Sequence, residues 1–145
     1  MKKPPEVLNS RVVAQSRLFR VEERHLRFSN GTEVHYERLL SGSTGAVLVV
    51  PLLDDQTVLM IREYAAGTHR YELALPKGLI DKGEDVLDAA NRELQEETGH
   101  AARNLRELTR LSIAPGYLSH FTRIVLAQDL YAQKLEGDEP EEIEV

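Results

Sequence analysis

The segment Asp85–Thr98 constrains this 145-residue chain most, because it has the pattern of an amphipathic helix. Apolar residues recur at spacings of three and four, which places them on one core-facing side of a helix. Gly99 follows, and glycine is the residue that most readily takes the left-handed conformation after a helix end. The predicted core-facing residues of this helix are Val86, Leu87, Ala90 and Leu94.

The same helix carries three carboxylates on another face, because Glu93, Glu96 and Glu97 are spaced at i, i+3 and i+4. Like charges at these spacings repel by a few tenths of a kcal/mol per pair. They also lie near the negative end of the helix dipole, which costs roughly 0.3–1 kcal/mol for each exposed acid. One interpretation is a solvated acidic face. The other is a site for Mg²⁺, which prefers hard oxygen ligands. The second interpretation would explain why the three carboxylates stand where they destabilise the helix.

Two features beside the carboxylates allow a structural or a functional interpretation. Arg92 can pair with Glu96 at i+4 and orient that carboxylate, or can form an ordinary surface ion pair of little value. The preceding loop, Leu75–Glu84, contains Gly78 and Gly83. Glycine lets the backbone approach a ligand or metal closely, but the loop could also be a plain strand-to-helix connection.

The rest of the chain predicts strands. Ala46–Val50 is a continuous apolar run, typical of a strand buried on both faces. Asn30-Gly31 predicts a hairpin turn, and the parity of apolar residues changes between Phe19 and Phe28, which predicts a bulge between Glu22 and His25. Further strands are predicted at Thr57–Arg62, Tyr71–Leu75, Leu105–Ala114 and Thr122–Leu130.

One long helix among several strands predicts an α/β or α+β fold with a mixed sheet. The Gly/Ser-rich break at Ser41–Gly45 separates an N-terminal β-hairpin region, residues 1–44, from a main domain, residues 45–145. The net charge of −6 disfavours nucleic-acid partners, because an acidic chain repels phosphate backbones. The sequence has no apolar run long enough to span a membrane and no cysteine, so we expect a cytoplasmic protein.

The segment Gly78–His100 resembles the Nudix box, Gly-x5-Glu-x7-Arg-Glu-apolar-x-Glu-Glu-x-Gly-apolar. The last position departs from it, because His100 stands where an apolar residue is usual. The resemblance implies a Nudix fold, an α/β/α sandwich with a mixed central sheet. The matching residues are Gly78, Glu84, Arg92, Glu93, Leu94, Glu96, Glu97 and Gly99.

The resemblance also implies roles for the box residues. Glu93 and Glu97 would be the central metal ligands and Glu96 a further ligand, with the backbone carbonyl of Lys77 joining them. Arg92 would act in catalysis by bracing the loop against the helix together with Glu84. The implied cofactor is Mg²⁺, with Mn²⁺ as the alternative.

Outside the box, Pro115 and Tyr117 lie 16 and 18 residues after Gly99. This pair resembles the ADP-ribose pyrophosphatase and ADP-compounds hydrolase branch, and marks both residues as substrate-binding. That branch implies a general base on the acidic C-terminal loop, where Glu141 matches best and Glu139 next. A disordered acidic tail is the alternative.

Two arginines are further substrate-binding candidates for the phosphates, Arg62 by resemblance and Arg38 by its place in the hairpin region. The branch also implies that the hairpin region mediates a homodimer. Because its members continue past this point, we expect that residues 45–145 are truncated at the C-terminus.

The expected activity is Mg²⁺-dependent hydrolysis of a nucleoside diphosphate linked to another group, such as ADP-ribose, a diadenosine polyphosphate or NADH. Two alternatives remain. One is a dinucleoside polyphosphate or nucleoside triphosphate hydrolase. The other is a non-catalytic nucleotide-binding module, which usually has a degraded box.

Overall fold

The computed structural model describes residues 2–42, 44–138 and 140–145. The chain forms two compact units. The first contains Met1–Ser43 and Ser112–His120, and the second contains Thr44–Leu111 and Phe121–Val145. No helix of the described residues has both the length and the apolar character that a membrane span needs.

The first unit is built on an antiparallel sheet in the order β1-β2-β3. Its strands are β1 (Glu6–Gln15), β2 (Arg20–Arg27) and β3 (Glu33–Leu40). The predicted Asn-Gly turn is confirmed between β2 and β3, where Gly31 has a φ of 83°. The Gly31 N–H donates to the Phe28 carbonyl at 2.9 Å.

The predicted bulge between Glu22 and His25 is wrong. β2 pairs with β3 residue for residue, and the register shifts lie in β1, between Val7 and Asn9 and between Val12 and Ala14. Six consecutive residues of β2 are half-buried, so both faces of the strand are partly covered. A change of apolar parity in such a strand needs no bulge.

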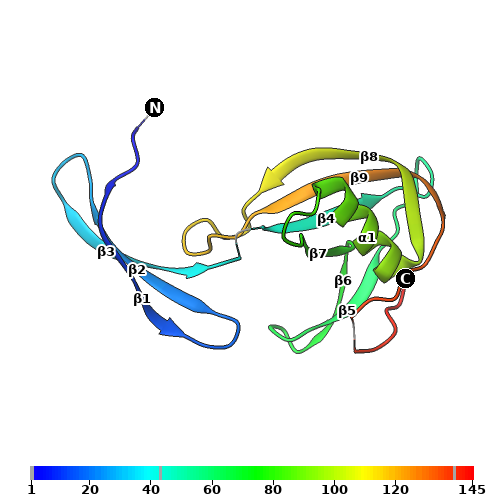
Figure 1. The fold of residues 1–145 in the computed structure, drawn as a ribbon, viewed down its shortest axis with the longest axis horizontal. Coiled ribbons are helices and arrows are strands. Elements are labelled where there is room, and N and C mark those ends of the chain that lie inside the picture. The colour runs from blue at the N-terminus through cyan, green and yellow to red at the C-terminus, as the bar shows by residue number, and fades with distance from the viewer. Residues whose placement is uncertain (1, 43, 139) are drawn as a thin grey trace. The chain divides into compact units, whose positions relative to one another are not determined.

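The second unit contains a mixed sheet, a hairpin and one helix (Figure 1). The sheet has the order β7-β4-β9-β8, with β4 and β9 parallel and the other neighbours antiparallel. A separate hairpin pairs β5 with β6. The elements are β4 (Ala46–Pro51), β5 (Ile61–Ala65), β6 (Arg70–Ala74), β7 (Lys77–Leu79), α1 (Val86–Thr98), β8 (His100–Leu111) and β9 (Thr122–Ala132).

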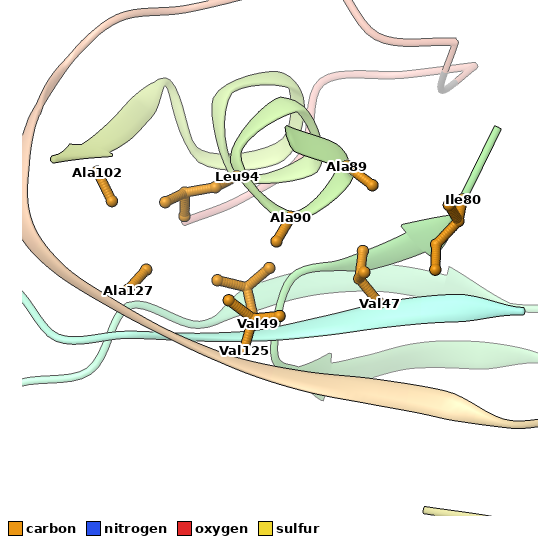
Figure 2. Packing of buried hydrophobic residues seen from close by; sticks show 9 residues of the cluster. All are labelled: Val47, Val49, Ile80, Ala89, Ala90, Leu94, Ala102, Val125 and Ala127. Atoms are coloured by element: carbon orange, nitrogen blue, oxygen red, sulfur yellow. The ribbon is translucent and has the colours of Figure 1, made fainter. Parts of the chain in front are cut away.

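Helix α1 has the predicted boundaries because both ends are capped. The Asp85 side chain accepts from the Leu87 N–H at 2.8 Å, and Gly99 has a left-handed φ of 71°. Ala90 and Leu94 are fully buried as predicted, whereas Val86 and Leu87 are only partly buried. Side chains of α1 face those of β4 and β9 across the core, as Figure 2 shows.

The mixed sheet of the predicted Nudix fold is confirmed, and β4 is the buried strand expected from its apolar run. α1 is the one helix in the described residues, so a second helical layer of an α/β/α sandwich is absent from them. Two elements therefore position the site. Helix α1 lies against the sheet, and the short strand β7 leads into the loop that precedes α1.

Candidate metal centre

Gly78 lies where β7 meets the carboxylates of α1. Its backbone pairs with Val47 of β4, and a Cβ at this position would overlap the Glu93 carboxylate. The backbone at Gly78 therefore approaches a side chain closely, as predicted, and that side chain is Glu93. Any larger residue would have to displace that carboxylate or the strand.

Arg92 joins the loop before α1 to the helix. Its Nε and Nη2 donate to the Glu84 carboxylate at 2.9 and 3.1 Å, and Nη2 also donates to the Leu79 carbonyl at 2.9 Å. Its Nη1 donates to Glu93 at 2.7 Å and to Glu96 at 3.0 Å. Hydrogen bonds from the Arg92 guanidinium hold the pKa of Glu84 below its usual value. One cation therefore fixes three carboxylates relative to the loop.

Glu97 is a buried carboxylate with little compensation. It is 4% exposed, and its Oε2 accepts from the Lys77 backbone N–H at 2.8 Å. Desolvation raises the pKa of Glu97 to about 8, and the nearby negative charges of Glu93 and Glu63 act in the same direction. The Lys77 N–H and charge oppose this shift without cancelling it.

The carboxylates of α1 open into one cavity of about 660 Å³. Glu93 and Glu97 therefore line the same cavity. Among the described residues, however, no three His, Asp or Glu side chains are already close enough together to coordinate a metal ion. Glu93 and Glu96 face Arg92 instead, and Glu97 faces the Lys77 N–H. The residues lining the cavity are Glu63, Lys77, Gly78, Leu79, Asp81, Arg92, Glu93, Glu96, Glu97, Glu136, Gly137, Asp138 and Pro140.

This donor set fits a divalent cation. It supplies several hard carboxylate oxygens, and two of the carboxylates, Glu93 and Glu97, are buried at 7% and 4% exposure. Buried carboxylates that lie close together are costly unless a cation compensates their charge. Glu93, Glu96 and Glu97 would hold the metal, and Lys77, whose carbonyl is the further predicted ligand, also lines this cavity.

The structure does not bring Glu141 into this cavity. Its Oε1 accepts from the Tyr71 hydroxyl at 2.6 Å, and this hydrogen bond raises the pKa of Tyr71. Glu141 lines a smaller pocket, of about 80 Å³, together with Arg62. Arg62 itself lies 3.4 Å from the Glu144 carboxylate and is not among the described residues that line the large cavity. Glu139 lies outside the described residues.

Sequence reasoning missed four acids of this cavity, which are Glu63, Asp81, Glu136 and Asp138. Glu63 lies just outside the predicted strand Thr57–Arg62, and no sequence pattern links it to the carboxylates of α1. Glu136 and Asp138 belong to the acidic segment that the sequence singled out, but only the fold shows which acids of that segment enter the cavity.

The remaining substrate-binding candidates belong to the first unit. Arg38, Pro115 and Tyr117 line a cavity of about 310 Å³ together with the aromatic rings of Phe28 and Tyr36. The Arg38 Nε donates to Glu22 at 2.6 Å, so its guanidinium is already held by a carboxylate. The three predicted residues therefore come together in one pocket with aromatic walls.

Comparison with known proteins agrees with this geometry. Residues 42–145 match the model of the NUDIX domain. This range includes the mixed sheet and the helix with clustered carboxylates, and the chain belongs to the Nudix hydrolase family. It is therefore a hydrolase of that family, whose members generally use a divalent metal.

Residues 5–38 match the model of the NudE-type Nudix hydrolase N-terminal domain. This match indicates which branch of the Nudix family the chain resembles. The chain is 56% identical over 137 residues to the ADP compounds hydrolase NudE of Escherichia coli, covering 94% of this chain and 73% of that protein. A crystal structure of an ADP compounds hydrolase matches with a TM-score of 0.91 and 51% identity, over 99% of this chain and 77% of that one.

A more distant relative is the ADP-ribose pyrophosphatase of Bacillus subtilis. It is 34% identical over 103 residues, which is 70% of this chain and 56% of that protein. The chain therefore spans about half of that relative and about three quarters of the E. coli one.

Proposed function

We propose that this protein hydrolyses the diphosphate linkage of ADP-ribose and related ADP compounds with Mg²⁺, or Mn²⁺, as cofactor. The observation that carries the proposal is the convergence of the α1 carboxylates on one cavity, next to β7 and its Gly78. The substrate class is supported by the relatives, which are named for ADP compounds and ADP-ribose.

Each side chain has a defined task in this proposal. Glu93 and Glu97, with Glu96, would hold the metal, and Arg92 would fix the positions of Glu93 and Glu96 through its hydrogen bonds to both carboxylates. The Lys77 N–H fixes Glu97 at 2.8 Å. A bound Mg²⁺ would supply Lewis-acid polarisation of the diphosphate and a lower pKa for a water molecule. The products from ADP-ribose would be AMP and ribose 5-phosphate.

An acid of the segment 136–141 would take the proton from the attacking water. Glu141 remains our candidate by resemblance to the family, with Glu139 next. In the structure, however, Glu136 and Asp138 line the cavity, while Glu141 is bound to Tyr71. The variants Glu141→Gln and Asp138→Asn separate the two possibilities. The variant that lowers kcat by orders of magnitude identifies the base, and equal small losses in both would reject both residues.

The pocket of the first unit is the proposed site for the nucleoside. Phe28, Tyr36 and Tyr117 give it aromatic walls, which suit a planar base. The first unit is also the proposed dimerisation layer, because several apolar side chains of β1 and the turn after it are exposed. They are Val7, Val12, Val13, Leu18 and Phe19. A homodimer, a cytoplasmic location and the lack of nucleic-acid partners remain predictions.

A substrate panel tests the proposed function. The intact protein with Mg²⁺ should release AMP from ADP-ribose, and the same assay should be run with diadenosine triphosphate, NADH and nucleoside triphosphates. Excess chelator should abolish turnover. A preference for nucleoside triphosphates would contradict the substrate class. Tight ADP-ribose binding without turnover would instead indicate a binding module.

A further inference from the structure

The cavity at the α1 carboxylates is short of positive charge for a diphosphate substrate. Of its described lining residues, seven are acids and two, Lys77 and Arg92, are cations. Even with divalent metal bound to Glu93, Glu96 and Glu97, the other acids still repel phosphate oxygens. A substrate anion in this cavity therefore gains from any side-chain cation that is able to turn toward it.

Arg92 is not such a cation. Its Nε, Nη1 and Nη2 atoms are all engaged, with Glu84, Glu93, Glu96 and the Leu79 carbonyl as acceptors. These hydrogen bonds raise the pKa of Arg92 and commit its charge to the protein's own carboxylates. Releasing it would unlock the loop from the helix.

Lys77 differs from Arg92 in the number of its partners and in how firmly they hold its charge. Its Nζ makes an ion pair with Glu63, and the two side chains are 43% and 37% exposed. An ion pair at this exposure contributes little to stability, so exchanging one anionic partner for another costs little. An ammonium group has three donors, and Glu63 occupies one of them.

The backbone of Lys77 places this side chain at the metal centre. Its N–H donates to Glu97 at 2.8 Å, and its pairing with Leu48 fixes it in β7. Lys77 and its ion-pair partner Glu63 both line the cavity into which the α1 carboxylates open. A diphosphate bound in this cavity would therefore share it with the Lys77 side chain.

We propose that the Lys77 side chain is a substrate-binding residue, which leaves Glu63 and donates to a non-bridging phosphate oxygen of the diphosphate. Glu63 then acts as the resting partner that keeps the ammonium at the cavity. This inference rests on the proposed function, because it assumes a diphosphate at the α1 carboxylates. Lysine suits the role as a compact charge that can rotate between two acceptors.

A matched pair of variants, Lys77→Met and Glu63→Gln, tests the proposal against a purely structural ion pair. The probe is α,β-methylene-ADP, which cannot be hydrolysed between its phosphorus atoms, titrated into the Mg²⁺-loaded protein by calorimetry. Lys77→Met should weaken binding about 10-fold or more, since a charge-assisted hydrogen bond is lost. Glu63→Gln should leave binding unchanged or tighten it, because a competitor for Nζ is removed. Lys77→Arg should recover part of the affinity.

Two further readouts separate this inference from the proposed function. The affinity for Mn²⁺ without nucleotide should be unchanged or higher in Lys77→Met, because a positive charge beside Glu97 is removed. With ADP-ribose as substrate, Lys77→Met should lower kcat/KM mainly by raising KM. Equal affinity of wild type and Lys77→Met for the probe, or parallel losses in Lys77→Met and Glu63→Gln, would overturn the role of Lys77. Failure of the wild type to cleave ADP-ribose while Lys77→Met still weakens probe binding would overturn only the substrate assignment.

Discussion

Glu97 shows at the residue scale how the site works against the stability of the fold. Its carboxylate is buried near other acids, in the last turn of a helix that has no basic residue there. Desolvation holds the pKa of Glu97 at about 8. Such an arrangement destabilises the protein when no cation is bound, and it places a carboxylate where a cation can bind to it. Stability and function therefore oppose each other at this side chain.

Replacing Glu97 by Gln separates these two effects. Turnover of ADP-ribose should fall by orders of magnitude, because a central metal ligand is lost. The melting temperature in chelator should stay the same or rise, because an uncompensated buried charge is removed. The matched control is Glu107→Gln, which breaks the ion pair with Arg123 outside the cavity and should leave turnover unchanged. Unchanged turnover in Glu97→Gln would refute the metal assignment.

The pKa of Glu97 also predicts how the metal-free protein responds to pH. The folded-state pKa is about 8 and the unfolded-state value is 4.5, so the folded state binds more protons between these values. Stability therefore falls as pH rises from 4.5 to 8, by an amount on the order of a few kcal/mol. Urea unfolding in chelator at pH 5 and pH 8 measures this loss. Glu97→Gln should reduce it, and an identical pH dependence in that variant would contradict the prediction.

At the element scale, the sequence predicted α1 well and the strands less well. α1 has a regular apolar stripe and capping residues at both ends, so local signals defined its bounds. The strand predicted at Thr57–Arg62 forms at Ile61–Ala65 instead, because pairing with β6 selects those residues. A strand is defined by its partner, and the sequence gives no direct measure of that partner.

The packing of β7 against α1 gives a prediction at the same scale. Gly78→Ala would place a Cβ on the Glu93 carboxylate, so the strand or Glu93 must move. We expect a loss of about 1–3 kcal/mol in unfolding free energy and a strong loss of metal affinity. Gly67→Ala is the control, since a Cβ there meets nothing within 4 Å. Wild-type metal affinity in Gly78→Ala would show that this close approach is not needed.

At the scale of the whole molecule, long-range contacts were beyond sequence reasoning. From the sequence, the acidic C-terminal segment has two interpretations, a catalytic loop and a disordered tail. In the structure it pairs with β5, where the Arg62 N–H donates to the Glu144 carbonyl at 2.8 Å, and it brings Asp138 to the carboxylate cavity, so the segment is not a disordered tail. The two residues of that backbone pair are far apart in the sequence, and no local pattern links them. The box residues were identified because their spacing is fixed within one loop and one helix.

The proposed function depends most directly on whether the α1 carboxylates bind a divalent metal. Mn²⁺ titrated into the intact protein and followed by electron paramagnetic resonance measures this without any substrate. Wild type should bind Mn²⁺, Mg²⁺ should compete for the same site, and Glu93→Gln and Glu97→Gln should each weaken binding at least about 10-fold. Equal Mn²⁺ affinity in wild type and both variants would contradict the central claim.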